Sequence, residues 1–89
     1  MAMSIDELIT MSKNVGLAAL DGCPADTYEK MTALIEQIIA ISPSMKDGFI
    51  HGLNEVIKNL LEAQKVDDLN KIYDFVTYEM VYLLNNYRK

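Results

Sequence analysis

The residue types that most often carry out chemistry in proteins are sparse in this 89-residue chain. The single histidine, His51, stands four residues before Glu55, a spacing that places both side chains on one face of a helix. Such a pair can give a zinc ion two ligands, but a zinc site needs further ligands that the sequence does not provide. We therefore expect neither a bound metal nor a cofactor.

The single cysteine, Cys23, directly precedes Pro24 at the expected start of a helix. No histidine lies in a pattern that would turn this thiol into a nucleophile, so we interpret Cys23 as a helix-entry residue. One cysteine cannot form an internal disulfide, and a composition with six methionines is typical of a reducing compartment. The sequence thus predicts a cytoplasmic protein.

Acidic residues outnumber basic ones by 13 to 8, which gives a formal net charge of -5. We interpret five glutamates on polar helical positions as solvated charges rather than as a catalytic pair, namely Glu7, Glu29, Glu36, Glu55 and Glu62. Glu79 differs, because helical spacing places it between Phe75 and Leu83 at the border of an apolar face. Its carboxylate is expected to bond a neighbouring helix or a partner. No phosphate-binding glycine loop, G-x-S-x-G or H-E-x-x-H motif occurs, so the sequence predicts that the protein is not an enzyme.

The lysines and arginines are spread along the chain rather than gathered in one segment. Nucleic acid and anionic membranes attract clustered positive charge, which this chain lacks. No apolar stretch approaches the roughly 18 residues that a membrane span requires. The amino end carries Asp6 and Glu7 where a signal peptide would carry positive charge. We expect neither nucleic acid nor membrane as a partner.

Four segments repeat their apolar residues with the helical period, and each is bounded by residues that favour helix ends. Short connections between them favour antiparallel neighbours. Because the chain is 51% hydrophobic, one small domain covers its apolar residues poorly, which favours an oligomer. The predicted fold is all-α, either an antiparallel four-helix bundle or a helical hairpin completed by homodimerisation. The expected helices of this single domain, residues 1–89, span about residues 5–20, 24–41, 43–64 and 68–87.

The expected helix ends have simple causes. Ser4 and Glu7 form a capping box, and Gly22 can take the left-handed conformation that ends a helix. The third helix is expected to begin at Pro43 with one of the two flanking serines as its cap, and Met45 opens its apolar seam. The core stripe of the second helix is expected to comprise Tyr28, Met31, Ile35, Ile38 and Ile39, widened by Leu34 and Ile41.

The last helix carries more apolar surface than one core needs. Phe75, Tyr78 and Tyr82 lie on the side opposite its core face when the residues are placed at 100° intervals. Aromatic residues are enriched at the centres of protein interfaces, so we predict a partner-binding surface of Phe75, Tyr78, Tyr82 and Glu79. The alternative is that this helix lies centrally in its own subunit and is covered on both sides.

The stretch VDDLNKIYDFVTYEM, residues 66–80, with its D-x-x-x-x-x-D-x-x-x-Y-E spacing, resembles the carboxyl-terminal helix of small helical proteins from flagellated bacteria. The plan of short acidic helices ending in an amphipathic helix also resembles flagellar and type III export chaperones. This resemblance implies a cytosolic chaperone or adaptor that shields a helical segment of a secreted subunit. Phe75, Tyr78 and Tyr82 are the contacts that the resemblance implies.

The sequence therefore predicts a protein-binding module, chaperone- or adaptor-like, that captures a helical segment of a partner and forms a homodimer. The alternative is an acidic inhibitor or immunity protein that blocks a basic site on an enzyme or nuclease. Salt distinguishes the two, because screening weakens an electrostatic blocker much more than a groove binder.

Overall fold

The structure, a computed structural model, describes residues 3–89. Three segments, α4 (Leu69–Asp74), η2 (Phe75–Glu79) and α5 (Met80–Tyr87), follow one another without a break and form one rod, the C-terminal helix. No strand occurs in the described residues, which confirms the all-α prediction. The elements are α1 (Ile5–Leu20), α2 (Pro24–Ile41), the 3₁₀ turn η1 (Ser42–Ser44), α3 (Phe49–Lys65), α4 (Leu69–Asp74), the π-helical segment η2 (Phe75–Glu79) and α5 (Met80–Tyr87).

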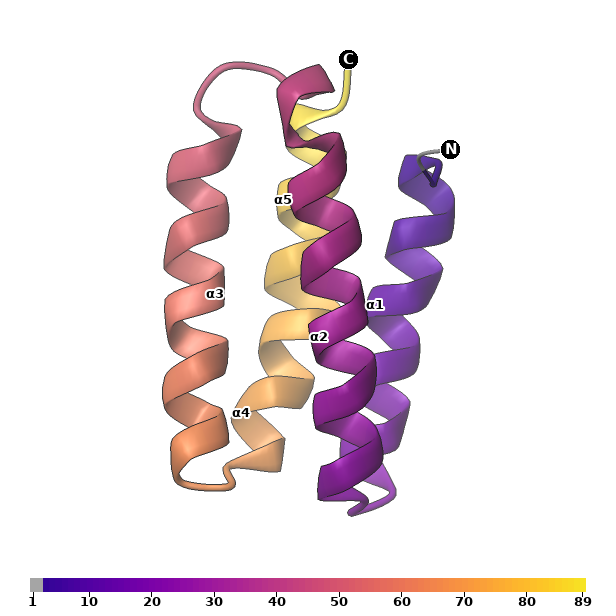
Figure 1. Cartoon of the computed structure of the whole chain (residues 1–89), viewed down its shortest axis with the longest axis vertical. Coiled ribbons are helices and arrows are strands. Elements are labelled where there is room, and N and C mark those ends of the chain that lie inside the picture. The colour runs from indigo at the N-terminus through magenta and orange to yellow at the C-terminus, as the bar shows by residue number, and fades with distance from the viewer. Residues whose placement is uncertain (1–2) are drawn as a thin grey trace.

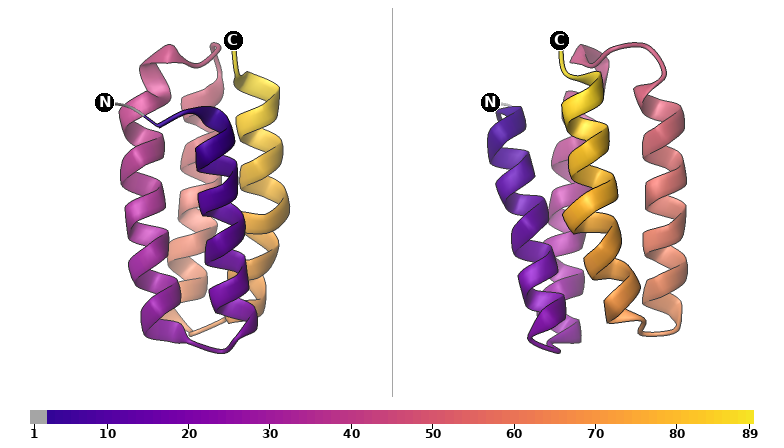
Figure 2. Two further views of the ribbon diagram at one scale, coloured as in Figure 1. Left: turned by 90° about the vertical axis from the view of Figure 1, so that its right-hand side faces the viewer. Right: turned by 180° about the vertical axis from the view of Figure 1, so that it is seen from behind.

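The helices lie side by side along the long axis of the molecule, and consecutive helices run in opposite directions (Figures 1 and 2). α1 packs against α2 and also against the C-terminal helix, and α3 packs against the C-terminal helix from the other side. α2 and α3 are consecutive in the chain, yet they share far fewer close backbone approaches than these pairs do. One side of the molecule is therefore less tightly closed than the others.

The hydrophobic core runs along the centre and draws on every α-helix. The expected core stripe of α2 is wrong at Ile39, which is 53% exposed, because this residue lies on the flank that faces α3, and α3 stands too far away to cover it. Leu34 and Ile41, expected at the margin of the stripe, are buried. Large side chains that are almost fully buried include Leu8, Met31, Leu34, Ile38, Phe49, Leu60, Ile72, Met80 and Leu84.

The first two helices and the last begin and end as the residue types predict. The Ser4 amide donates to Oε1 of Glu7 at 3.0 Å, and the Glu7 amide donates to Oγ of Ser4 at 3.1 Å, so the capping box is formed. Gly22 has φ +70° and ends the turn after α1. The Asp68 carboxylate accepts from the Lys71 amide at 3.0 Å and caps the C-terminal helix.

The predicted start of the third helix is wrong. α3 begins at Phe49 rather than at residue 43, and neither flanking serine caps it. Ser42 and Ser44 instead donate their hydroxyls back to the carbonyls of Ile39 and Ile41, so the turn around Pro43 continues α2. The residues around Pro43 therefore follow the end of α2 and do not begin α3. They add one 3₁₀ turn to the preceding helix.

The connection from this turn to α3 is fixed by contacts that the helical pattern does not reveal. Met45 takes an extended backbone conformation and is still buried, so it fills the core from a loop. The Lys46 amide donates to the Tyr87 carbonyl at 2.8 Å, which ties the connection to the end of α5. Gly48 has φ +92° and is the residue that precedes α3, a conformation that glycine adopts without strain.

The C-terminal helix widens into a π-helical turn at η2. The Met80 amide donates to the carbonyl of Phe75, five residues back, instead of four. Fully buried residues of this helix recur every fourth position, and on a regular α-helix each such step drifts by about 40°. A turn with more residues corrects this drift, so the π-helical segment keeps one line of side chains in the core. The four side chains are Ile72, Val76, Met80 and Leu84.

Small residues of α1 fit against this widened turn. The Ser12 hydroxyl, which is buried, donates to the carbonyl of Val76 and satisfies a polar group inside η2. A Cβ atom at Gly16 would lie 2.5 Å from Oγ1 of Thr77 and 3.3 Å from Cδ1 of Tyr73, so only glycine allows this approach. The backbone of α1 therefore comes close enough to hold the C-terminal helix in place.

Candidate protein-binding surface

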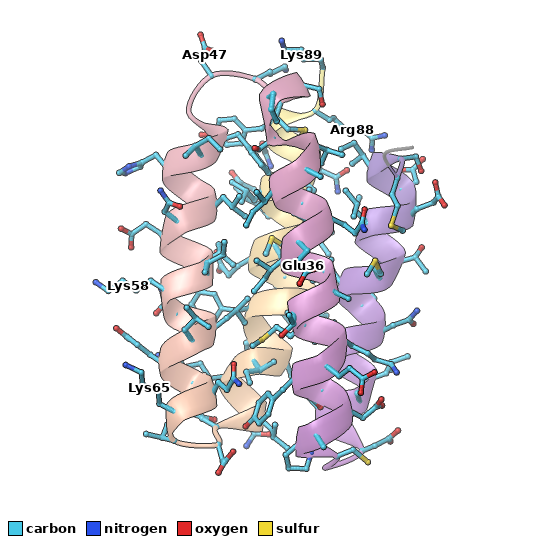
Figure 3. The ribbon with its side chains drawn as sticks, in the orientation of Figure 1. Glu36, Asp47, Lys58, Lys65, Arg88 and Lys89 are labelled. Carbon is cyan, nitrogen blue, oxygen red and sulfur yellow. The ribbon has the colours of Figure 1, made fainter. Side chains whose placement is uncertain are left out.

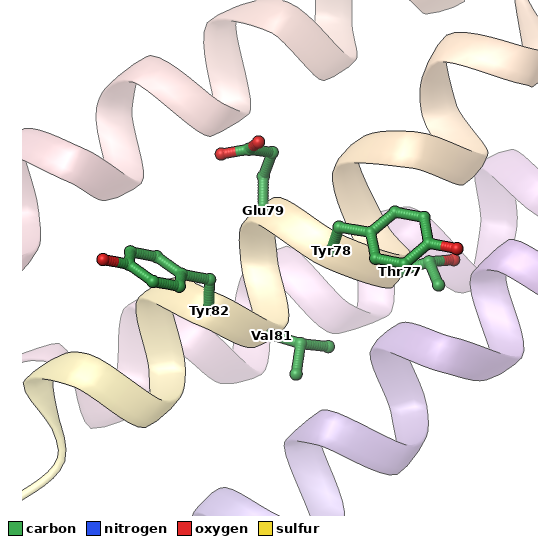
Figure 4. A pocket seen from close by; sticks show the side chains of 5 residues that line it. All are labelled: Thr77, Tyr78, Glu79, Val81 and Tyr82. Atoms are coloured by element: carbon green, nitrogen blue, oxygen red, sulfur yellow. The ribbon is translucent and has the colours of Figure 1, made fainter.

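The structure separates the four predicted site residues into two groups. Tyr78 and Tyr82 are 61% and 67% exposed, and Glu79 between them is also exposed. Phe75 is half-buried and packs against the core cluster. The two tyrosines and the glutamate therefore share an outward surface of η2 and α5 (Figure 4). Phe75 lies deeper, where it lines a neighbouring hollow together with Glu79 and Tyr82.

A shallow hollow of about 490 Å³ lies on this surface. We call its lining the tyrosine surface, and Figure 4 shows the side chains projecting from one helix. The rings of Tyr78 and Tyr82 flank the hollow one helical turn apart. The lining residues are Thr77, Tyr78, Glu79, Val81 and Tyr82.

Tyr78 is held in place by another tyrosine. Its ring packs edge to face against the ring of Tyr73, with centroids 6.2 Å apart and planes at 86°. Such aromatic pairs favour this geometry and restrict the ring. A side chain that is mostly exposed thus has a defined orientation without a bound partner, which lowers the entropy cost of contact.

A second hollow of about 390 Å³ lies next to the first, between α3 and the C-terminal helix. Gly52 of α3 lies close to α5 here, because a Cβ atom there would come within 2.7 Å of Cδ1 of Leu83. Glu79 and Tyr82 line both hollows, so the two form one continuous surface. The lining residues are Gly52, Glu55, Val56, Asn59, Phe75, Glu79, Tyr82, Leu83 and Tyr87.

Gly48 and Gly52 both lie close to a side chain of α5. Gly52 touches α5 through Leu83, as described above. A Cβ atom at Gly48, which precedes α3, would lie 3.2 Å from Cε1 of Tyr87, and the φ of +92° there also favours glycine. Both glycines therefore allow close approach, and Gly48 also takes a left-handed backbone conformation.

The charge of this surface is negative. Glu79 and Glu55 both line the second hollow, and in residues 3–89 neither carboxylate takes part in an ion pair. Glu79 also accepts no side-chain hydrogen bond from the described residues, so its expected bond to a neighbouring helix is not formed there. The expected bond to a partner stays a prediction.

His51 and Cys23, the two residues with the most reactive side chains, do not line this surface. His51 is exposed on α3, and Cys23 is exposed at the start of α2. Within residues 3–89, no three side chains among His, Cys, Asp and Glu gather closely enough to hold a metal ion. No helix in the described part of the chain is long and apolar enough to cross a membrane.

Sequence reasoning missed two members of the tyrosine surface, Thr77 and Val81. Each directly precedes one of the tyrosines, and the pair has the same four-residue spacing. Residues four apart lie on one helical face, so this spacing was a signal that could have identified them. The contribution of α3 to the second hollow could not be read from one helix alone.

Comparison of the chain with protein-family models, with curated proteins and with solved structures found no match. The resemblance to export chaperones therefore stays a prediction. The geometry of the surface itself is therefore the basis for a proposal about function.

Proposed function

We propose that this chain is a non-enzymatic, cytoplasmic protein-binding module, chaperone- or adaptor-like, which captures a helical segment of a partner on the tyrosine surface. The observation that carries the proposal is the exposure of Tyr78 and Tyr82, 61% and 67%, on a helix whose other side is fully buried. Exposed aromatic residues in a contiguous patch are typical of interaction sites.

The shape of the surface favours a helix as the bound segment. The two hollows lie side by side and share Glu79 and Tyr82, so one ligand can contact both. An amphipathic helix places apolar side chains at i, i+3, i+4 and i+7, and these can fill adjacent hollows. Such a helix with basic flanks also complements Glu55 and Glu79.

The helix that carries the surface is packed between two others. We propose that the helices form an antiparallel four-helix bundle in which the C-terminal helix is clamped between α1 and α3. Its contacts to both of these helices support that arrangement. A preorganised surface loses little conformational entropy on binding, which raises affinity.

The alternative is an acidic inhibitor that blocks a basic site of an enzyme or nuclease. The net charge of -5 and the unpaired carboxylates of Glu55 and Glu79 favour it. Charge-driven binding weakens steeply with salt, whereas apolar groove binding does not. Affinity at two salt concentrations therefore separates the two functions.

The probe we choose is a synthetic amphipathic helical peptide with a leucine stripe and lysine flanks, compared with a peptide of the same composition in scrambled order. Nuclear magnetic resonance titration of the ¹⁵N-labelled protein would locate the contact. We expect the ordered peptide to shift amide signals of Thr77, Tyr78, Val81 and Tyr82, and the scrambled peptide to leave them in place.

Variants sharpen this test. Tyr78→Ala combined with Tyr82→Ala should weaken peptide binding at least tenfold. A tyrosine buried at an interface often contributes about 1 kcal/mol or more to the binding free energy. Leu17→Ala with Leu20→Ala is the matched control, since both leucines are 58% exposed on α1. Equal weakening by both pairs, or equal binding of the two peptides, would reject the tyrosine surface as a specific site.

A further inference from the structure

A second apolar area lies away from the tyrosine surface, along the side where α2 and α3 stand apart. Ile39 on α2 is 53% exposed, and Ile50 and Leu61 on α3 are 50% and 47% exposed. Ile35 and Ile57 beside them are half-buried. We call these five residues the α2–α3 face.

The residues on α3 share one flank. Ile57 and Leu61 follow Ile50 by seven and eleven positions, which is the helical repeat. The opposite flank of α3 carries Gly52, which touches Leu83 of α5. The flank with Ile50, Ile57 and Leu61 is therefore turned away from the C-terminal helix and towards α2.

The residues on α2 are oriented by a hydrogen bond. The Tyr28 hydroxyl donates at 2.6 Å to Oδ1 of Asp67, which lies in the connection after α3. Ile35 and Ile39 follow Tyr28 by seven and eleven positions, so they lie on the same flank. Both helices thus direct isoleucines to the side where they approach each other least.

The rims of this face carry opposite charges. Glu36 projects from α2, and Lys58 and Lys65 project from the outer side of α3 (Figure 3). None of the three forms an ion pair with another residue in the range 3–89. The carboxylate of Glu36 and the ammonium groups of Lys58 and Lys65 therefore stand on opposite sides of the isoleucine and leucine side chains, and the exposed Glu62 lies on α3 between the two lysines in sequence.

This pattern is complementary to itself. A two-fold axis parallel to the helices would set α2 of one copy against α3 of the other, because an isologous interface pairs each residue with its counterpart on the same patch. Glu36 and Lys58 stand at similar heights along the long axis in Figure 3. Each Glu36 would then meet Lys58 of the second copy, twice per dimer.

We propose that the chain forms a homodimer through the α2–α3 face, with two Glu36–Lys58 ion pairs at its edges and the exposed isoleucines at its centre. The C-terminal helix lies behind α2 in the view of Figure 1 and faces the viewer in the right-hand view of Figure 2. The dimer therefore leaves the tyrosine surface of each copy free. The proposal does not depend on what that surface binds.

The test is sedimentation equilibrium of the whole chain with charge-reversal variants. Glu36→Lys and Lys58→Glu alone should each raise the dimer dissociation constant at least tenfold, because each places two like-charged pairs at the interface. An equimolar mixture of the two variants should favour the heterodimer, because both of its contacts between positions 36 and 58 then join opposite charges. The double variant Glu36→Lys with Lys58→Glu should return towards the wild-type constant.

Two further variants keep the result interpretable. Ile39→Glu should abolish the dimer while circular dichroism shows an unchanged helical fold, since this side chain is mostly exposed in the single chain. Lys13→Glu on α1 is exposed and lies away from the face, so it should leave the constant unchanged. A wild-type chain that stays monomeric at millimolar concentration, or a dimer that ignores Ile39→Glu and both charge reversals, would overturn the proposal.

Discussion

The two faces of the C-terminal helix are both apolar, but they differ in how far the other helices cover them. The inner face holds Ile72, Val76, Met80 and Leu84, none of which is exposed to any measurable extent. The outer face holds Tyr78 and Tyr82, which are more than half exposed. The comparison shows that apolar residues on a helix do not by themselves identify a core, because the neighbouring helices decide which face is covered.

The inner face is also packed by means of special features of the backbone and of α1. The π-helical turn aligns its side chains, the Ser12 hydroxyl satisfies the carbonyl of Val76, and Gly16 leaves room for Thr77. The outer face has no comparable adjustment among the described residues. The inner face therefore serves folding, and we propose that the outer face serves recognition; the following predictions test that division.

The largest effect is expected from Gly16→Ala on the inner face. The new methyl group would overlap Oγ1 of Thr77 at 2.5 Å, so α1 would have to move away from the C-terminal helix. We expect the free energy of unfolding in urea to fall by about 2 kcal/mol, as overpacked cores usually show.

The matched control is Gly52→Ala, at the margin of the second hollow. Its methyl group would meet Cδ1 of Leu83 at 2.7 Å, but that atom is the end of a flexible side chain. Alanine also favours a helix over glycine by about 1 kcal/mol, so we expect little net change. Equal losses at both glycines would argue against a special fit between α1 and η2.

Ser12→Ala should have the next largest effect. Without the hydroxyl, the buried carbonyl of Val76 loses its donor inside η2. We expect a loss of about 1–2 kcal/mol in the free energy of unfolding, the usual result of leaving one buried polar group unsatisfied. A variant as stable as the wild type would mean that the π-helical turn does not need this bond.

A smaller and pH-dependent effect is expected at Tyr28, far from the inner face. Its hydrogen bond to Asp67, with some burial, raises the pKa of Tyr28 from 10.0 to about 12. Because the folded pKa lies above the unfolded one, this stabilisation is complete below pH 10 and is lost as the pH rises towards 12. Wild type and Tyr28→Phe should therefore differ in urea stability at about pH 8 and converge near about pH 12. A difference that does not change with pH would exclude the hydroxyl as its source.

The limits of α1 and α2 could be predicted because their ends depend on local chemistry. A capping box, a glycine and a proline act within one turn of the chain, and the sequence displays them directly. The start of α3 could not be predicted in this way. It depends on a distant contact, between Lys46 and the end of α5, and on Gly48, whose left-handed conformation precedes the helix.

The candidate site was foreseen in part for a similar reason. Helical spacing placed Tyr78 and Tyr82 together on the outer side, and the structure exposes both. Spacing on a regular helix could not show that Phe75 turns inward to the core cluster, because a π-helical turn begins at that residue. The interval of four between buried residues was the available signal for that turn.

The apolar composition predicted an oligomer, but the total solvent-exposed area of the chain does not by itself require one. The chain exposes 5232 Å², close to the value of about 5,200 Å² expected for a folded monomer of its mass. The case for association therefore depends on where exposed apolar side chains gather. Five of the exposed large apolar side chains lie on the tyrosine surface or on the α2–α3 face, namely Tyr78, Tyr82, Ile39, Ile50 and Leu61, whereas Leu17, Leu20 and Val66 lie elsewhere.

The division between the two faces of the C-terminal helix is tested most directly by urea unfolding of the variant Tyr78→Ala with Tyr82→Ala. We predict a free energy of unfolding within about 1 kcal/mol of the wild type, because surface substitutions change stability little. The half-buried Phe75 gives the comparison, since Phe75→Ala should lose more than the tyrosine pair together. A loss of more than about 2 kcal/mol in the tyrosine variant, as for core truncations, would show that both faces serve folding and would contradict the account.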